Sequence, residues 1–161
     1  MISGAVGILA AVIGIPLAVA DGSPSQQVAA DIPPVAVEDF NYPGAADILV
    51  TKGITLKRGD GHILLADCDA GLDQIRVYTV KDDAAGRDGN YCFQATAKTG
   101  YVTLELPRVF ALETAEHPIS ADLTANGQTT TVAVAKDRFE SVGEGTVGGA
   151  RSVLVEIRVT G

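Results

Sequence analysis

The sequence predicts an all-β fold: an antiparallel β-sandwich, jelly-roll or immunoglobulin-like, with one short helix and an extended N-terminal arm. The first observation is an alternation of apolar and polar residues, which buries one face of a strand and exposes the other. The second is that turn signals separate these runs, as at Gly59-Asp60-Gly61, Lys98-Thr99-Gly100 and Asn126-Gly127. Together they indicate eight or nine strands at short spacing, which is typical of antiparallel sandwiches rather than of parallel sheets.

The first 20 residues, Met1 to Ala20, are apolar and carry no charge. They end in Ala18-Val19-Ala20, where small residues fit the site of a signal peptidase, so residues 1–20 are predicted to be a signal peptide. A retained membrane anchor is the alternative, since a spanning helix needs about 20 apolar residues. Three glycines, one proline and the lack of a basic flank argue against the anchor. We therefore expect a secreted, extracellular protein that has no membrane contact after cleavage.

Residues 21–42 are predicted to form an extended arm. Asp21 to Asp39 contains four acids and three prolines, and no basic or aromatic residue. Each proline restrains itself and its predecessor to β or polyproline geometry, and a stiff segment loses less entropy when a partner captures it. We predict that the arm binds another protein in a groove or at a sheet edge, with a flexible tether as the alternative. The predicted partner-binding residues are Ile32, Pro33, Pro34, Val35, Val37, Phe40 and Tyr42.

Residues 43–161 are predicted to form one β-sandwich domain. The short helix is expected at Ala45 to Lys52, stopped by Gly53. Asn126-Gly127 should join Ile119–Ala125 to Gln128–Ala135 in a type I′ hairpin. Alternation predicts three further strands, in each of which three residues share the buried face. These sets are Ile75, Val77 and Thr79; Val102, Leu104 and Leu106; and Val153, Val155 and Ile157.

The only cysteines are Cys68 and Cys92. In an oxidising compartment they are predicted to form a disulfide, because no second thiol pair or histidine cluster indicates a metal or redox site. Closing a loop of this length stabilises a fold by roughly 3 kcal/mol. Two free buried thiols are the alternative, and they would follow if the protein were not exported.

No catalytic motif is recognisable, and we predict a protein that is not an enzyme and holds no cofactor. His62 and His117 do not stand at the spacing of a metal site or of a nucleophile and its base. At His62, after a Gly-Asp-Gly turn, a hydrogen-bonded structural histidine is expected. Asp60 and Glu105 form a conceivable acid and base pair, but nothing in the sequence brings them together.

The acidic residues suggest solvated turns rather than a metal site. The loop from Lys81 to Asn90 lacks the regular oxygen ligands of a calcium loop, and Asp67, Asp69 and Asp73 are expected to make local turn contacts.

Half of the net charge of −8 lies on the arm, which leaves sixteen acids against twelve bases in the body. This balance gives no electrostatic reason for binding nucleic acid or an anionic membrane.

Sugar binding is a second possible function, because secreted jelly rolls often stack sugar rings on aromatic side chains. The chain has no Trp, and the candidates are Tyr78, Tyr91 and Tyr101. If Tyr78 and Tyr101 lay side by side on an exposed sheet, that arrangement would strongly support sugar binding.

Three segments resemble a known family. Lys57 to Asp69 (KRGDGHILLADCD), Tyr91 to Pro107 (YCFQATAKTGYVTLELP) and Arg151 to Val159 (RSVLVEIRV) are similar to those of small exported actinobacterial proteins, the UmbB-like adaptor subunits of the umbrella toxin particles of Streptomyces. The resemblance implies a subunit of a secreted antibacterial complex that joins a lectin-like subunit to a repeat-containing toxin polypeptide. It also implies that the N-terminal segment, here near Val28 to Tyr42, enters a cleft of the lectin-like subunit. We therefore expect a non-catalytic adaptor, with a secreted carbohydrate-binding module as the alternative.

Overall fold

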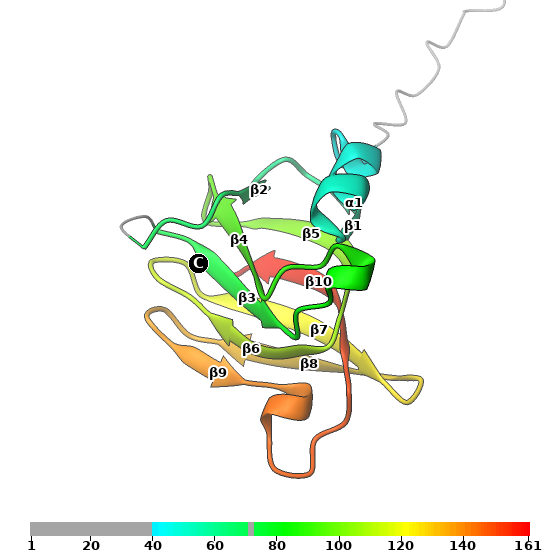
Figure 1. Ribbon diagram of the computed structural model, residues 1–161. Helices are drawn as coiled ribbons and strands as arrows, with labels where there is room; N and C mark the ends of the chain where they lie inside the picture. The colour runs from blue at the N-terminus through cyan, green and yellow to red at the C-terminus, as the bar shows by residue number, and fades with distance from the viewer. Residues whose placement is uncertain (1–39, 71–72) are drawn as a thin grey trace, which may run out of the picture. The chain divides into compact units, whose positions relative to one another are not determined.

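A computed structural model of the chain describes residues 40–70 and 73–161 (Figure 1). The described part consists mainly of β-strands, with one α-helix, α1 (Ala45–Lys52), and two short 3-10 helices, η1 (Asp83–Ala85) and η2 (Gly143–Gly145). The strands are β1 (Thr55–Gly59), β2 (Ile63–Ala66), β3 (Ile75–Thr79), β4 (Asn90–Ala95), β5 (Gly100–Pro107), β6 (Val109–Glu113), β7 (Ile119–Ala125), β8 (Gln128–Val134), β9 (Phe139–Ser141) and β10 (Val153–Val159).

The strands form two five-stranded sheets. The first sheet has the order β1-β5-β10-β7-β8 and the second has the order β2-β4-β3-β6-β9. All pairings within them are antiparallel, and Figure 1 shows one sheet behind the other. The predicted antiparallel β-sandwich is therefore confirmed.

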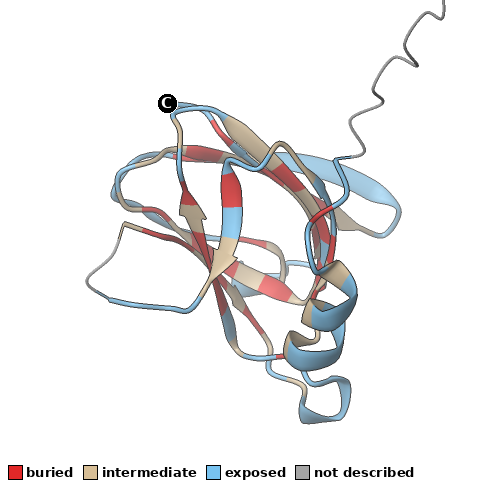
Figure 2. Cartoon of the chain, turned by 90° about the horizontal axis from the view of Figure 1, so that it is seen from above, coloured by how far each residue is buried: buried red, intermediate tan, exposed pale blue. Residues whose placement is uncertain are grey.

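The core lies between the two sheets, and strands of both contribute buried residues, which are red in Figure 2. The predicted alternation is confirmed in β3, where Ile75, Val77 and Thr79 are buried, and in β5, where Val102, Leu104 and Leu106 are buried. The largest fully buried side chains are Phe93, Ile54, Ile63, Ile75, Leu104, Leu106, Leu112, Ile119, Leu154, Ile157, Val77 and Val102. Their burial stabilises the sandwich through the hydrophobic effect.

The helix α1 has the predicted bounds. It ends at Gly53, whose backbone amide donates to the carbonyl of Leu49 at 3.0 Å in a left-handed C-cap. None of its residues is fully buried. The helix lies beside β1 (Figure 1), at the edge of the first sheet where the described chain begins.

The predicted hairpin between β7 and β8 is also confirmed. Asn126 and Gly127 both have positive φ, 51° and 76°, as a two-residue type I′ turn requires. Seven consecutive residue pairs, from Ile119 opposite Val134 to Ala125 opposite Gln128, follow without a register shift. The second strand ends at Val134, one residue before the predicted end.

The prediction for the last strand needs a correction, because β10 contains a β-bulge. Leu154 and Glu156 lie opposite the adjacent residues Leu123 and Asp122 of β7, so β10 carries one extra residue against that strand. An inserted residue reverses the alternation on one side of a bulge. Leu154 is consequently fully buried together with Ile157, whereas Val153 and Val155 are only partly buried. The predicted inward set was right for Ile157 and wrong for the two valines.

The strand count in the described residues is ten rather than eight or nine. The strand least visible in the sequence is β9, three residues long and exposed throughout. It shows no alternation in burial, and among the described strands it pairs with β6 at the edge of the second sheet.

Candidate functional site

The predicted partner-binding residues lie on both sides of the point where the described part of the chain begins, at Phe40. Phe40 and Tyr42 lie inside it. The other five lie outside the described residues: Ile32, Pro33, Pro34, Val35 and Val37.

Residues 40–42 pair with β1 at the edge of the first sheet. The amide of Gly59 donates to the carbonyl of Phe40 at 2.9 Å, and the amide of Tyr42 donates to the carbonyl of Lys57 at 2.9 Å. Asn41 forms an antiparallel bridge with Arg58 between these two bonds. The chain therefore enters the sandwich as a short extension of the first sheet.

Tyr42 belongs to the core of the sandwich. Its side chain is 9% exposed, and its hydroxyl accepts a hydrogen bond of 2.6 Å from the amide of Leu65 in β2. Phe40, in contrast, is 43% exposed. The structure thus places Phe40 where a partner can reach it and Tyr42 where only the domain contacts it, and these contacts begin before the predicted domain start at residue 43.

The predicted disulfide between Cys68 and Cys92 is present, with an S–S distance of 2.06 Å. Cys92 lies in β4 opposite Ala66, and Cys68 follows β2 by two residues. The bond therefore ties the segment that follows β2 to the neighbouring strand. Such a bond is typical of proteins that fold in an oxidising compartment.

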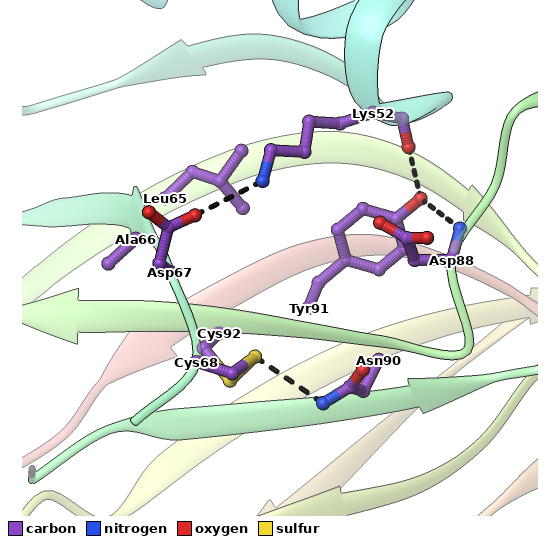
Figure 3. Close-up of a pocket in the computed structure, with 9 residues that line it drawn as sticks. All are labelled: Lys52, Leu65, Ala66, Asp67, Cys68, Asp88, Asn90, Tyr91 and Cys92. Carbon is purple, nitrogen blue, oxygen red and sulfur yellow. Dashed lines mark hydrogen bonds and ion pairs between the residues drawn. A yellow bond between two sulfur atoms is a disulfide. The ribbon is translucent and has the colours of Figure 1, made fainter. Parts of the chain in front are cut away.

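A pocket of about 180 Å³ lies beside the disulfide (Figure 3). In it the hydroxyl of Tyr91 donates to the carbonyl of Lys52 and accepts from the amide of Asp88. Lys52 also pairs with Asp67 at 3.1 Å. Burial raises the pKa of Tyr91, so the phenol stays protonated and keeps donating. These groups bind the end of α1 to two loops, which gives the pocket a structural role.

Two acids of the loop between β3 and β4, Asp82 and Asp83, are engaged with neighbouring groups. Asp82 caps η1 by accepting from the amide of Ala85 at 3.2 Å, and its other oxygen lies 3.3 Å from Arg87. Asp83 pairs with Lys81 at 2.7 Å. Across residues 40–70 and 73–161, no three His, Cys, Asp or Glu side chains group closely enough to hold a metal ion.

The aspartates near Cys68 make tertiary as well as local contacts. Asp67 reaches Lys52 of α1, and Asp73 accepts a hydrogen bond of 2.7 Å from the amide of Glu116. Asp73 also lies 3.7 Å from His117. Asp67 and Asp73 therefore contact residues distant in the sequence in addition to the turns in which they lie.

The candidate acid and base pair is not brought together. Asp60 follows the end of β1 and accepts from the amides of His62 and Tyr101 at 3.1 and 3.2 Å. Glu105 faces the start of β1, opposite Thr55, and pairs with a lysine of that strand at 2.6 Å. The ring of His62 is half exposed, and its Nδ1 lies 3.5 Å from Asp60.

The three candidate tyrosines do not form one sugar-binding face. Tyr78 lies in β3 of the second sheet and Tyr101 in β5 of the first, while Tyr91 is buried. Tyr101 instead has the guanidinium of Arg158 over its ring, at 5.2 Å. The condition that would have strengthened the sugar-binding hypothesis is therefore not met.

An aromatic cluster that the sequence did not reveal lies on the outer side of the second sheet. It consists of Tyr78, Phe110 and Phe139, and we call it the outer aromatic cluster. The ring of Tyr78 lies 6.3 Å from that of Phe110 and 5.7 Å from that of Phe139. The hydroxyl of Tyr78 donates to Glu113 at 2.5 Å, which raises the pKa of the tyrosine. Phe139 is 57% exposed, so the cluster is open to solvent.

A second opening lies between the two sheets at the β8 side of the sandwich, and we call it the edge groove. Its volume is about 310 Å³. Its walls come from β7 and β8, from β9 and from the loop that follows β9: Leu123, Ala125, Thr130, Val132, Glu140, Ser141, Val142, Gly143, Thr146, Gly149, Ala150 and Ser152. Most of these side chains are small or apolar.

The loop wall of the edge groove is fixed by an ion pair. Arg108 donates to both carboxylate oxygens of Glu144, at 3.0 and 2.7 Å, a bidentate geometry that is stronger than a single contact. The same contact holds the pKa of Glu144 below its usual value. The loop also packs closely on itself, because a Cβ at Gly149 would stand 1.8 Å from the carbonyl oxygen of Gly143.

Comparisons with known proteins add no identification. No protein-family model matches the chain, and no curated protein matches it. Among the helices that the structure describes, none is sufficiently long and apolar to cross a membrane.

Proposed function

We propose that the protein is a secreted, non-catalytic adaptor subunit of an extracellular antibacterial toxin complex. Its N-terminal arm would bind a lectin-like subunit, and its β domain would bind a repeat-containing toxin polypeptide. The assignment to a toxin complex rests on the resemblance to UmbB-like adaptor subunits. The three segments that carry this resemblance contain strands of the sandwich. Lys57–Asp69 spans the end of β1 and all of β2, Tyr91–Pro107 spans most of β4 and all of β5, and Arg151–Val159 contains β10.

The observation that carries the proposal is how the chain enters the sandwich. Phe40 and Tyr42 pair with the backbone of β1, and the Tyr42 side chain is buried. A partner that contacts the exposed Phe40 would therefore bind at a defined edge of the sandwich. Such a connection suits an adaptor, whose task is to fix the position of one partner relative to another.

The contacts of the charged groups support a non-catalytic role. Glu105 pairs with Lys57, Glu144 with Arg108, and Asp82 with Arg87. A catalytic acid or base must lie within reach of the substrate proton that it transfers. The carboxylates of these pairs are instead bound to neighbouring cations that stabilise loops and strands.

Export is supported by two independent features. The first twenty residues are apolar and end in Ala18-Val19-Ala20, which fits a signal-peptidase site. The two cysteines of the chain form a disulfide, as is common in proteins of oxidising compartments.

The adaptor proposal is tested by purifying tagged protein from the culture medium of the producing bacterium and identifying bound proteins by mass spectrometry. The mature chain 21–161 is compared with a chain that starts at Phe40, which keeps the contacts of Asn41 and Tyr42. We expect the shorter chain to lose the lectin-like protein and to keep the toxin polypeptide. A full-length chain in which Ile32, Val35 and Val37 are replaced by serine is the matched control for arm length and should behave like the shorter chain. Recovery of the same proteins with and without the arm would contradict the proposal.

Carbohydrate binding is the second candidate function, and the outer aromatic cluster is the observation that favours it. Phe139 is exposed beside Tyr78, and the strand pairing places Arg76, Glu113 and Phe139 opposite one another in three adjacent strands. Aromatic rings next to hydrogen-bonding side chains are the usual parts of a sugar site.

A glycan array on the chain that starts at Phe40 separates the two functions. A carbohydrate module should bind defined glycans without any protein partner, and Phe139→Ala should abolish that binding. Absence of glycan binding, together with loss of the lectin-like protein from the arm-deleted chain, is the result that the adaptor proposal expects.

A further inference from the structure

The two cysteines of the disulfide differ in their access to solvent. Cys68, in the segment that follows β2, is exposed, whereas Cys92 in β4 is 0% exposed. The side-chain amide of Asn90 donates to Sγ of Cys68 at 3.4 Å, as Figure 3 shows. A small molecule in solution can therefore reach Cys68 in the folded domain, but it cannot reach Cys92 unless the surroundings of that residue move.

This difference decides how the bond can exchange with a thiol. In exchange a thiolate attacks one sulfur of the disulfide, and the other sulfur leaves as a thiolate. Access to each sulfur helps to decide which one is attacked, and the stability of the leaving thiolate helps to set the rate. Access selects Cys68 as the attacked residue, so Cys92 carries the leaving sulfur.

Arg76 is placed to stabilise the sulfur that leaves. It lies directly opposite Cys92 in the neighbouring strand β3, so the two side chains share one face of the sheet and are neighbours there. Its guanidinium donates to the carbonyl of Asp69, the residue after Cys68, at 2.8 Å. The other terminal nitrogen of the guanidinium lies 3.7 Å from Glu113 of β6, on the side of β3 away from β4. A cation beside a sulfur favours the thiolate form.

We propose that the bond between Cys68 and Cys92 is a thiol-exchange site of the folded protein, at which a low-molecular-weight thiol becomes attached to Cys68. The thiolate of the small molecule attacks Sγ of Cys68, and a new S–S bond forms between these two atoms. The bond to Cys92 breaks, and its electron pair leaves on Sγ of Cys92, which then takes a proton from water. One disulfide replaces another, so the step needs no oxidant or reductant besides the thiol itself.

Cys92 makes the attachment reversible. Its backbone stays paired between β2 and β3, opposite Ala66, two residues before Cys68. The freed thiol can therefore attack Cys68 again and expel the small molecule, which restores the original bond. This inference goes beyond the proposed adaptor function, because it concerns a covalent modification of the domain rather than its contacts with other subunits.

The test treats the folded, unaltered protein with excess 2-mercaptoethanol in the absence of denaturant. Free thiols are blocked with iodoacetamide at successive times, and peptide mass spectrometry locates both groups. In chains that carry one mercaptoethanol, we expect it on Cys68 and the blocking group on Cys92. Sub-denaturing urea should leave the rate of exchange nearly unchanged, because the attack does not require unfolding.

Two results would overturn the inference and leave the adaptor function untouched. One is mercaptoethanol found mainly on Cys92, or equally on both cysteines, which would show that access does not select the attacked sulfur. The other is an exchange rate that rises steeply with sub-denaturing urea, which would show that the bond reacts only after the domain opens.

Substitutions of Arg76 test its part in the exchange. Arg76→Gln should slow the attachment to Cys68 about two- to fivefold, the effect of one partly exposed charge pair, whereas Arg76→Lys keeps the charge and should react almost as fast as wild type. Arg58→Gln removes an exposed arginine from β1 in the other sheet and should leave the rate unchanged. Equal rates for Arg76→Gln and wild type would overturn the role assigned to Arg76.

Discussion

The hydroxyl of Tyr42 accepts a hydrogen bond of 2.6 Å from the amide of Leu65. The backbone of Tyr42 pairs with β1 in the first sheet, whereas Leu65 lies in β2 of the second. One side chain at the start of the described domain thus connects both sheets.

Replacing Tyr42 tests that connection. Tyr42→Phe leaves the amide of Leu65 without its partner and should lower the free energy of unfolding by about 1–3 kcal/mol. Tyr42→Ala should cost more, about 3–5 kcal/mol, because it also removes a buried ring. Urea denaturation followed by circular dichroism measures both values. Phe40→Ala is the control, because the side chain of Phe40 is exposed. If Phe40→Ala lowered the free energy of unfolding as much as Tyr42→Ala, the difference in burial between the two residues would be contradicted.

Removing the disulfide should destabilise the domain without changing its fold. The two cysteines are 24 residues apart, and opening a loop of that size costs about 3 kcal/mol in the chain-entropy account. The double substitution Cys68→Ser and Cys92→Ser should therefore shift the urea midpoint downward. Wild-type protein in reducing agent should shift equally, and an unchanged midpoint in both would show that the bond contributes nothing.

The bulge in β10 predicts opposite sensitivities at adjacent residues. Leu154 is fully buried, whereas Val155 is only partly buried. Leu154→Ala should lower the free energy of unfolding by about 2–5 kcal/mol, and Val155→Ala should have a clearly smaller effect. Thermal and chemical denaturation of both variants provide the comparison. A larger loss of stability for Val155→Ala than for Leu154→Ala would contradict the bulge and would support the simple alternation that the sequence predicts.

The ion pair of Arg108 and Glu144 predicts a specific dependence of stability on pH. The contact lowers the pKa of Glu144 from its usual 4.5, so its contribution is complete above that value and disappears as the pH falls through the lower, folded-state pKa. Glu144→Gln should thus be less stable than wild type at pH 7, and the difference should shrink below about pH 4.5. Denaturation curves from pH 3 to pH 7 measure this. A difference that is constant across the range would exclude the ion pair as its cause.

Local signals in the sequence were sufficient for several elements. The residues that end α1 and turn the β7–β8 hairpin are a glycine at a C-cap and an Asn-Gly pair, whose conformational preferences do not depend on the rest of the fold. Cys68 and Cys92 could be paired because the chain offers no other thiol. These predictions were confirmed within one residue.

Features created by tertiary contacts could not be predicted in the same way. The bulge at Val155 needs the registers of β5 and β7, and the outer aromatic cluster combines Tyr78, Phe110 and Phe139 from three strands. Tyr42 was predicted to belong to the arm, and its burial and its contact with Leu65 show that it is part of the core. The edge groove likewise depends on how the loop after β9 packs beside β8.

The most direct test of the central claim is the native mass of the unaltered protein in culture medium, measured by size-exclusion chromatography with mass spectrometry of each fraction. If the arm connects the sandwich to other secreted subunits, the protein should elute well above the mass of a single chain, together with a lectin-like protein and a larger toxin polypeptide. Elution as a free monomer, with no other polypeptide in its fractions, would contradict the account.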